Sequence, residues 1–167
     1  MLTVALQQGI NGVVFGSLYV VACGGSLASA ALSFAAFAIG GVAGLAYAER
    51  SGAAPRRVLQ VSAIATAVLL IAWIGHPIGP FAFVLLFALG AAVAPHHPLS
   101  RARVYETALD RPAIANALER PFNLFDIVIP WGLGVVADHW GLVAALALLL
   151  LQPVAIGAVA TWRRGGG

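Results

Sequence analysis

The chain has 167 residues, of which 61% are hydrophobic and only 9% are charged, whereas about 25% of an ordinary soluble domain is charged. A soluble fold of this length could not bury so much apolar surface, so the composition excludes one and predicts a single integral membrane domain. The formal net charge of +3 includes nine basic residues. All nine are arginines beside apolar stretches, where such charges set membrane topology rather than bind nucleic acid.

Six apolar segments come close to the roughly 20 residues that a membrane-crossing helix requires. Glycines end the first segment at 24–25, and two prolines with a glycine prevent a helix at 76–80. Prolines and histidines stop the fourth at 95–98, and a polar connector follows. The predicted spans are 2–23, 26–48, 58–75, 81–94, 112–137 and 142–162, within one domain of residues 1–164 and before a disordered tail at 165–167.

The arginines divide unequally between the loops that these spans define. They occur at 49–57, at 95–111 and in the C-terminal tail, with Arg120 a little further into the fifth span. The arginine-free loops are 24–25, 76–80 and 138–141. Because arginine accumulates in cytoplasmic loops, we expect both termini in the cytoplasm and a multi-pass protein of the inner (plasma) membrane. The N-terminal stretch lacks the basic region of a cleavable signal peptide.

The fifth predicted span is the only long apolar segment with several strongly polar groups. Spacings of three and four residues place five residues on one stripe of a helix, namely Asn116, Glu119, Asn123, Asp126 and Pro130. Its other faces carry aliphatic and aromatic side chains. The pattern predicts a helix that meets lipid or other helices on most sides and a cavity or polar neighbours along the stripe. In the second span, the spacing of Gly40 and Gly44 predicts a small face for close helix approach.

Three stretches resemble parts of a known family. The opening LQQGINGVVFGSLYVV, followed by SFAAFAIGGVAG, is similar to the first two helices of that family's C-terminal half. The loop after the second span contains Gly44, Glu49, Arg50, Gly52, Arg56 and Arg57. It is similar to the loop signature of major facilitator superfamily transporters, with glutamate for the usual aspartate and three residues inserted before the basic pair. The fifth span and the turn after it resemble a second pattern of that family, carried by Ala117, Asn123, Gly132, Gly134, Asp138 and Gly141.

The resemblance covers nearly the whole chain and implies an all-α membrane fold that corresponds to one six-helix half of such a transporter. The fourth span lacks arginine and the loop signature is degraded, so the C-terminal half is the better match. Such transporters have two halves, with the substrate site between them near the bilayer midplane. We therefore expect a fragment, a truncated product or a subunit that pairs with a second half, either another copy or a separate chain.

The implied function is proton-coupled efflux (antiport) of a small molecule by alternating access. The alternative is a non-transporting assembly or regulatory subunit with the same helix bundle. The expected partners are the lipid bilayer, a small-molecule substrate and the second six-helix half, without nucleic acid. No cofactor is expected.

Asp126 is the candidate for proton or ion coupling. An ionised carboxylate inside the bilayer costs roughly 2.5–3.5 kcal/mol on insertion scales, so it requires a polar cavity or a partner. A carboxyl group in such a cavity can take up and release a proton during transport. The alternative is a structural hydrogen bond to a neighbouring helix. Asn123, on the same stripe, is a candidate for substrate binding or for a hydrogen bond across helices.

In the first span, Gln8, Asn11 and Tyr19 are spaced for one helix face. The family resemblance implies that the first helix of a half lines the cavity, which makes them candidate substrate contacts. The alternative is hydrogen bonding between helices. The predicted cytoplasmic gate or ion-pair network comprises Glu49, Arg50, Glu119 and Arg120.

The chain shows none of the motifs that would indicate an enzyme. It has no G-x-S-x-G, no H-E-x-x-H and no phosphate-binding loop, so we expect no catalytic residues. His96 and His97 are adjacent, lie between prolines and have no third ligand nearby, which argues against a metal site. We expect this pair in the headgroup region. The single cysteine, Cys23, excludes an intramolecular disulfide and a cysteine metal cluster.

Overall fold

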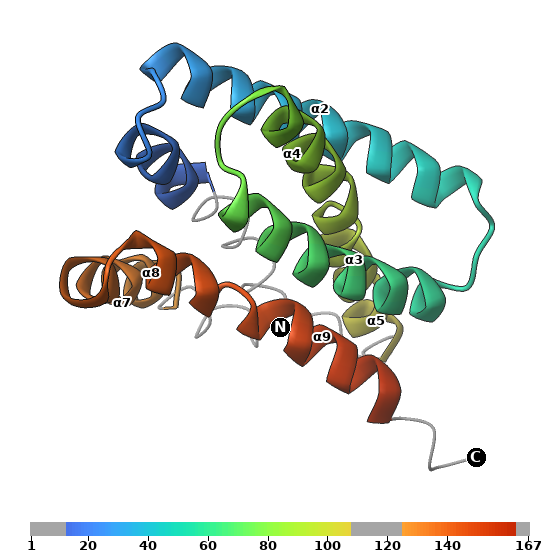
Figure 1. The fold of residues 1–167 in the computed structure, drawn as a ribbon. Coiled ribbons are helices and arrows are strands. Elements are labelled where there is room, and N and C mark those ends of the chain that lie inside the picture. Colours follow the sequence, from blue (N-terminus) through green and yellow to red (C-terminus); the bar gives the residue numbers. More distant parts are fainter. Residues whose placement is uncertain (1–12, 108–124, 163–167) are drawn as a thin grey trace.

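The computed structural model describes residues 13–107 and 125–162, and every regular element in these ranges is a helix (Figure 1). The helices are Val13–Ala22, α2 (Leu27–Arg50), α3 (Pro55–Gly75), α4 (Pro80–Val93), α5 (His96–Thr107), α7 (Phe125–Trp140), α8 (Leu142–Leu148) and α9 (Leu151–Trp162). Three stretches are long and apolar enough to cross a membrane, namely α2, α3 and Pro80–Ala102. These helices agree with the predicted all-α membrane fold class. The count of six spans stays a prediction, because the first and fifth spans are described only in part.

The first predicted turn forms as expected, at a pair of glycines. The N–H of Gly25 donates to the carbonyl of Val20 (2.9 Å), which closes the first described helix in a Schellman-type turn. Gly24 has a φ of 94°, a conformation that glycine adopts at little cost. Ser26 then begins α2, because its hydroxyl oxygen accepts the N–H of Ser29 (3.0 Å).

The fourth span departs from the expectation after its predicted end. Helix α4 stops at Val93, but the chain returns to helix at His96, and α5 occupies much of the expected polar connector. Pro98 is compatible with α5 because it lies in the first turn, where backbone N–H groups have no partner within the helix. The predicted end of the fourth span at the prolines is confirmed within one residue, and the polar connector after it is helical as far as Thr107.

The sixth predicted span is interrupted between α8 and α9. Pro153 has no N–H to donate to the carbonyl of Leu149. Hydrogen bonds at the break reach back three residues instead, from Gln152 to Leu149 (3.4 Å) and from Leu150 to Ala147 (3.0 Å). The break is the kind of bend that a proline produces inside a helix.

The closest helix contact joins α2 to α4. A Cβ at position 40 would lie 2.7 Å from the carbonyl carbon of Phe87, and a Cβ at position 44 would lie 2.6 Å from the Cα of Ala91. On α4, Gly90 meets the backbone of Phe37 in the same way. The predicted small face of α2 is confirmed, and its partner is α4.

The main apolar core lies where the first described helix, α3, α4, α7 and α8 meet. Its large members include Phe15, Trp73, Leu86, Leu133 and Leu146. A smaller cluster joins α3 to α9 through Leu59, Ala63 and Ile156, with Leu99 of α5 packed against it. The outer faces keep large apolar side chains exposed, such as Leu27 (80%) and Val42 (70%). Such faces suit contact with lipid.

The connections between the helices lie at two opposite ends of the bundle. The α2–α3 loop, α5 and the C-terminal end of α9 lie toward one end, and the arginine-free turns at 24–25, 76–80 and 141 lie toward the other (Figure 1). This separation agrees with the predicted division of arginines between inner and outer loops. The orientation of the chain in a membrane stays a prediction.

Candidate functional site

Asp126 lies in the first turn of α7, and its backbone is helical there. Pro130 lies inside the same helix. Because proline has no N–H, the carbonyl of Asp126, four residues earlier, lacks its usual helical donor. An acidic residue and a backbone carbonyl without its usual helical donor therefore coincide at one point of an apolar helix, an oxygen-rich position that suits a proton, a cation or water.

The length of α7 indicates the depth of this point. Trp140 ends the helix and is 71% exposed, as expected for an aromatic residue at a membrane boundary. Fourteen residues at 1.5 Å each place Asp126 about 21 Å from Trp140 along the helix. A hydrocarbon layer about 30 Å thick would then contain Asp126 when Trp140 lies at its outer edge.

Several predicted site residues lie outside the described residues. They are Gln8, Asn11, Glu119, Arg120 and Asn123. Their roles in substrate binding and in the gate stay predictions.

Tyr19 is buried and its hydroxyl is already engaged. It is 9% exposed, and the hydroxyl donates to the carbonyl of Ile74 (2.7 Å) near the end of α3. The last carbonyls of a helix have no donor within it, so this bond satisfies one of them. The Tyr19 ring also meets Trp73 edge to face, with centroids 5.8 Å apart. These contacts favour a role for Tyr19 in joining two helices rather than in contacting a substrate.

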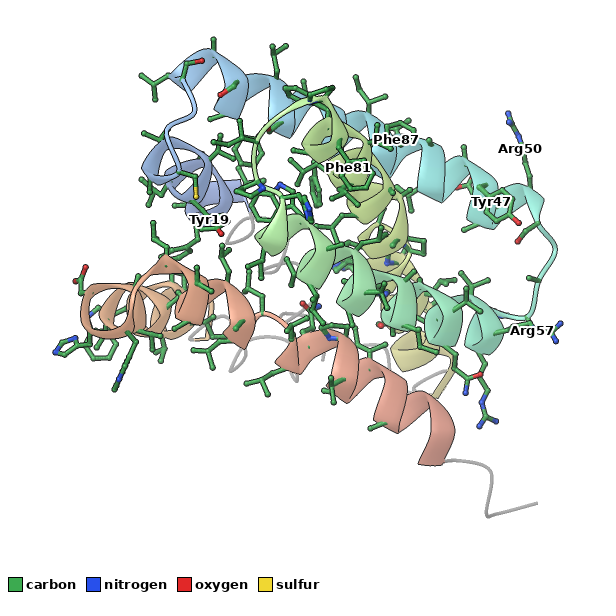
Figure 2. The ribbon with its side chains drawn as sticks, in the orientation of Figure 1. Tyr19, Tyr47, Arg50, Arg57, Phe81 and Phe87 are labelled. Carbon is green, nitrogen blue, oxygen red and sulfur yellow. The ribbon has the colours of Figure 1, made fainter. Side chains whose placement is uncertain are left out.

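Glu49 and Arg50 lie at the C-terminal end of α2 and are both exposed. Arg50 in the last turn complements the negative end of the helix dipole, and its side chain points away from the bundle (Figure 2). Neighbouring residues on a helix do not face each other, and no ion pair joins these two in the described structure. Their role in a gate stays a prediction.

Buried polar side chains gather where α3 packs against α5 and α9, a region that we call the α3 seam. They are Ser62 (7% exposed), Thr66 (0%), His96 (0%) and Gln152 (6%). The hydroxyl of Ser62 donates to the carbonyl of Leu59 in its own helix (3.2 Å). Within the described residues, Thr66 Oγ1, Gln152 Nε2 and both ring nitrogens of His96 have no hydrogen-bond partner.

The sequence contained signals for the α3 seam that our interpretation did not use. Gln152 is a polar residue in the middle of an apolar span, and Ser62 and Thr66 are one helical turn apart. The His96 side chain is enclosed by protein beside the backbone of Ser62, and its expected depth in the headgroup region stays a prediction. In the described ranges, no three His, Cys, Asp or Glu side chains come together as a metal site.

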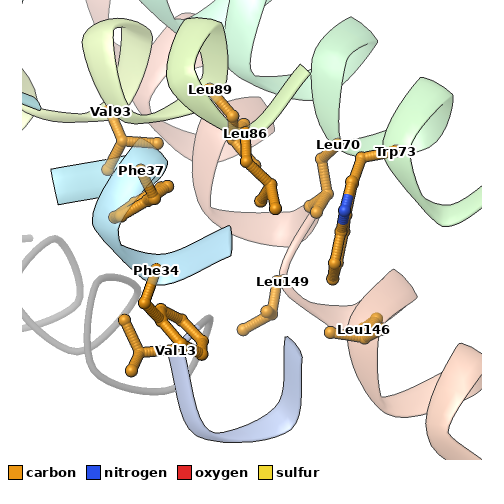
Figure 3. A pocket seen from close by; sticks show the side chains of 10 residues that line it. All are labelled: Val13, Phe34, Phe37, Leu70, Trp73, Leu86, Leu89, Val93, Leu146 and Leu149. Carbon is orange, nitrogen blue, oxygen red and sulfur yellow. The ribbon is translucent and has the colours of Figure 1, made fainter. Parts of the chain in front are cut away.

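The described residues enclose a small cavity beside the core. A cavity of about 30 Å³ lies between α2, α3, α4 and α8, lined only by apolar side chains such as Phe37, Trp73, Leu86 and Leu146 (Figure 3). Pockets for small molecules usually measure about 300–1,000 Å³. This cavity is therefore too small for a substrate, and its apolar walls disfavour water.

Comparison of the chain with protein-family models, curated proteins and solved structures gave no match. The likeness to major facilitator transporters rests on the motifs described above and is a hypothesis about this chain.

Proposed function

We propose that the chain is one six-helix half of a secondary transporter of the major facilitator type. It would export a small molecule in exchange for protons by rocking against a second half in the inner membrane. Asp126 would be the proton-coupling group, and Asn123, Gln8 and Asn11 would face the substrate. The observation that carries the proposal is the combination of Asp126 with Pro130, four residues later, in α7.

This combination supports transport for two reasons. A carboxylate at this depth is costly unless a polar cavity or a partner receives it. The backbone carbonyl that Pro130 leaves without a donor adds a second acceptor at the same level. Broken or proline-bent helices with such free carbonyls are the usual ion sites of secondary transporters.

The packing of the described residues supports the need for a second half. The core cavity of about 30 Å³ cannot hold a substrate. A transport site would then lie on a surface of this domain that another half completes, as in two-half transporters generally.

The first test is the native mass of the full chain, purified in mild detergent from its own host. A dimer, or a complex with another six-helix chain, is expected. A monomer without a partner would contradict the proposal, because the site between halves would never form.

The second test measures transport in proteoliposomes that carry an imposed pH gradient, with ethidium as the probe cation. The wild-type chain is expected to move ethidium in the direction opposite to protons, and Asp126→Asn is expected to abolish this movement. Asp138→Asn is the matched control, because Asp138 lies at the exposed end of the same helix. Retention of gradient-driven movement by Asp126→Asn would refute the coupling role.

One observation favours the second candidate function, a non-transporting assembly or regulatory subunit. The close contacts at Gly40, Gly44 and Gly90 fix α2 against α4 backbone to backbone, which suits a rigid scaffold. In that case Asp126→Asn would leave any complex intact and no gradient-driven movement would be found in the wild-type chain.

A further inference from the structure

An open groove of about 510 Å³ runs along the bundle surface between α2 and α3, with α4 as its floor. Its walls are almost wholly apolar and built from small side chains, including Ala43, Ala48, Val58, Val61, Ala65 and Ala92. The groove exists because α2 and α3 each pack on α4 rather than on each other. From position 57 to position 65 it follows α3 for about 12 Å, at 1.5 Å per residue.

The apolar walls restrict what can occupy this groove in a membrane. Water gains few hydrogen bonds there, so an apolar chain is the favoured occupant. The volume lies in the range of ligand pockets, about 300–1,000 Å³. The length along α3 corresponds to part of one leaflet rather than the whole hydrocarbon layer of about 30 Å. These dimensions suit the first part of a lipid acyl chain.

One end of the groove carries positive charge. Arg57 contributes to the lining and is exposed, and its side chain makes no hydrogen bond or ion pair with the described residues. Tyr47, 75% exposed, lies at the same end of the bundle as Arg57 (Figure 2). The segment 49–57 has three arginines and one acidic residue, Glu49, which gives a net charge of +2. This end is also the one that the arginine division assigns to the cytoplasmic surface.

We propose that this groove binds one anionic phospholipid of the inner leaflet, with its phosphate on Arg57 and one acyl chain along α3. The guanidinium group offers paired N–H donors that match phosphate oxygens. Basic residues at the cytoplasmic ends of membrane helices attract anionic headgroups. The Tyr47 hydroxyl, at the rim, can donate to the ester or phosphate oxygens. The site is independent of transport and applies equally to a transporter half and to a scaffold.

The test uses the full chain in mild detergent with equal amounts of phosphatidylglycerol and phosphatidylcholine that carry the same acyl chains. Native mass spectrometry then counts the lipids retained. The wild-type chain is expected to retain phosphatidylglycerol preferentially. Arg57→Gln is expected to weaken that preference about fivefold. Arg50→Gln, an exposed arginine of the same segment that does not line the groove, is expected to have a smaller effect.

A second pair of variants tests the acyl-chain position. Ala43→Phe fills the groove from an exposed position of α2 and is expected to reduce retention of both lipids. Ala35→Phe, at an exposed position of α2 outside the groove, is expected to leave retention unchanged. Equal retention of the two lipids by the wild-type chain would overturn the proposal. So would equal effects of Arg57→Gln and Arg50→Gln, or of the two phenylalanine variants.

Discussion

Replacing Gly40 by alanine is expected to destabilise the bundle, although alanine is the better helix former by roughly 1 kcal/mol. The new Cβ would lie 2.7 Å from the carbonyl carbon and 2.9 Å from the Cα of Phe87, whereas carbon atoms prefer separations of about 3.5–4.0 Å. Both atoms belong to the backbone of α4, so rotating a side chain cannot relieve the strain. Helices α2 and α4 would have to separate.

The magnitude follows from two opposing terms. Overpacking costs about 1–3 kcal/mol, and the gain in helix propensity offsets roughly 1 kcal/mol of it. Because the contacts involve backbone on both helices, we expect the upper end, a net loss of about 2 kcal/mol in the free energy of unfolding. Gly134→Ala is the matched control, since none of the described residues lies within 4 Å of its added Cβ. It should gain up to about 1 kcal/mol.

The assay is a titration of the purified chain with sodium dodecyl sulfate in mixed micelles, followed by tryptophan fluorescence. Trp73, one of four tryptophans, is only 3% exposed and lies in the core, so its exposure to solvent changes the total emission when packing is lost. The two variants are expected to differ by about 3 kcal/mol, the sum of the loss at one site and the gain at the other. Equal midpoints for Gly40→Ala and Gly134→Ala would refute the close contact between α2 and α4.

Two further predictions use the same titration. Tyr19→Phe removes the hydroxyl that donates to Ile74 and should lower the free energy of unfolding by about 1 kcal/mol, whereas Tyr47→Phe, at an exposed position, should not change it. Thr66→Val removes a buried hydroxyl without a partner among the described residues, so stability should hold or rise by up to about 2 kcal/mol. A loss above about 1 kcal/mol would mean that this hydroxyl is hydrogen-bonded in the folded protein.

The features that the sequence predicted well are those with local causes. Gly24 adopts a positive φ after the first described helix, and Pro80 stands in the first turn of α4. The end of the first described helix and the start of α4 therefore follow from backbone geometry alone. The bounds of α2 and α3 agree with the predicted spans within three residues, because long apolar runs leave few alternatives.

The features that the sequence did not predict depend on how distant parts of the chain pack together. Proline usually ends a helix, but Pro98 lies where a new helix begins, and only the structure distinguishes the two positions. Pro153 lies in a continuous apolar run, which hid the break between α8 and α9. The spacing of Gly40 and Gly44 predicts a small face but not which helix it meets, since any small-residue face is compatible with several partners. For Tyr19, the sequence left two interpretations that the bond to Ile74 separates.

The surface of α7 connects the packing of this domain with its proposed function. Gly134, which belongs to the motif that resembles the family pattern, has nothing among the described residues within 4 Å of an added Cβ, so it keeps one face of α7 small. Lipid tails adapt to such a face, whereas a second helix would need it to remain small. Gly134→Ala should therefore stabilise the chain as a monomer and weaken its association with a second half. If the variant raises stability and leaves the native mass of a complex unchanged, the second half must bind elsewhere on the domain.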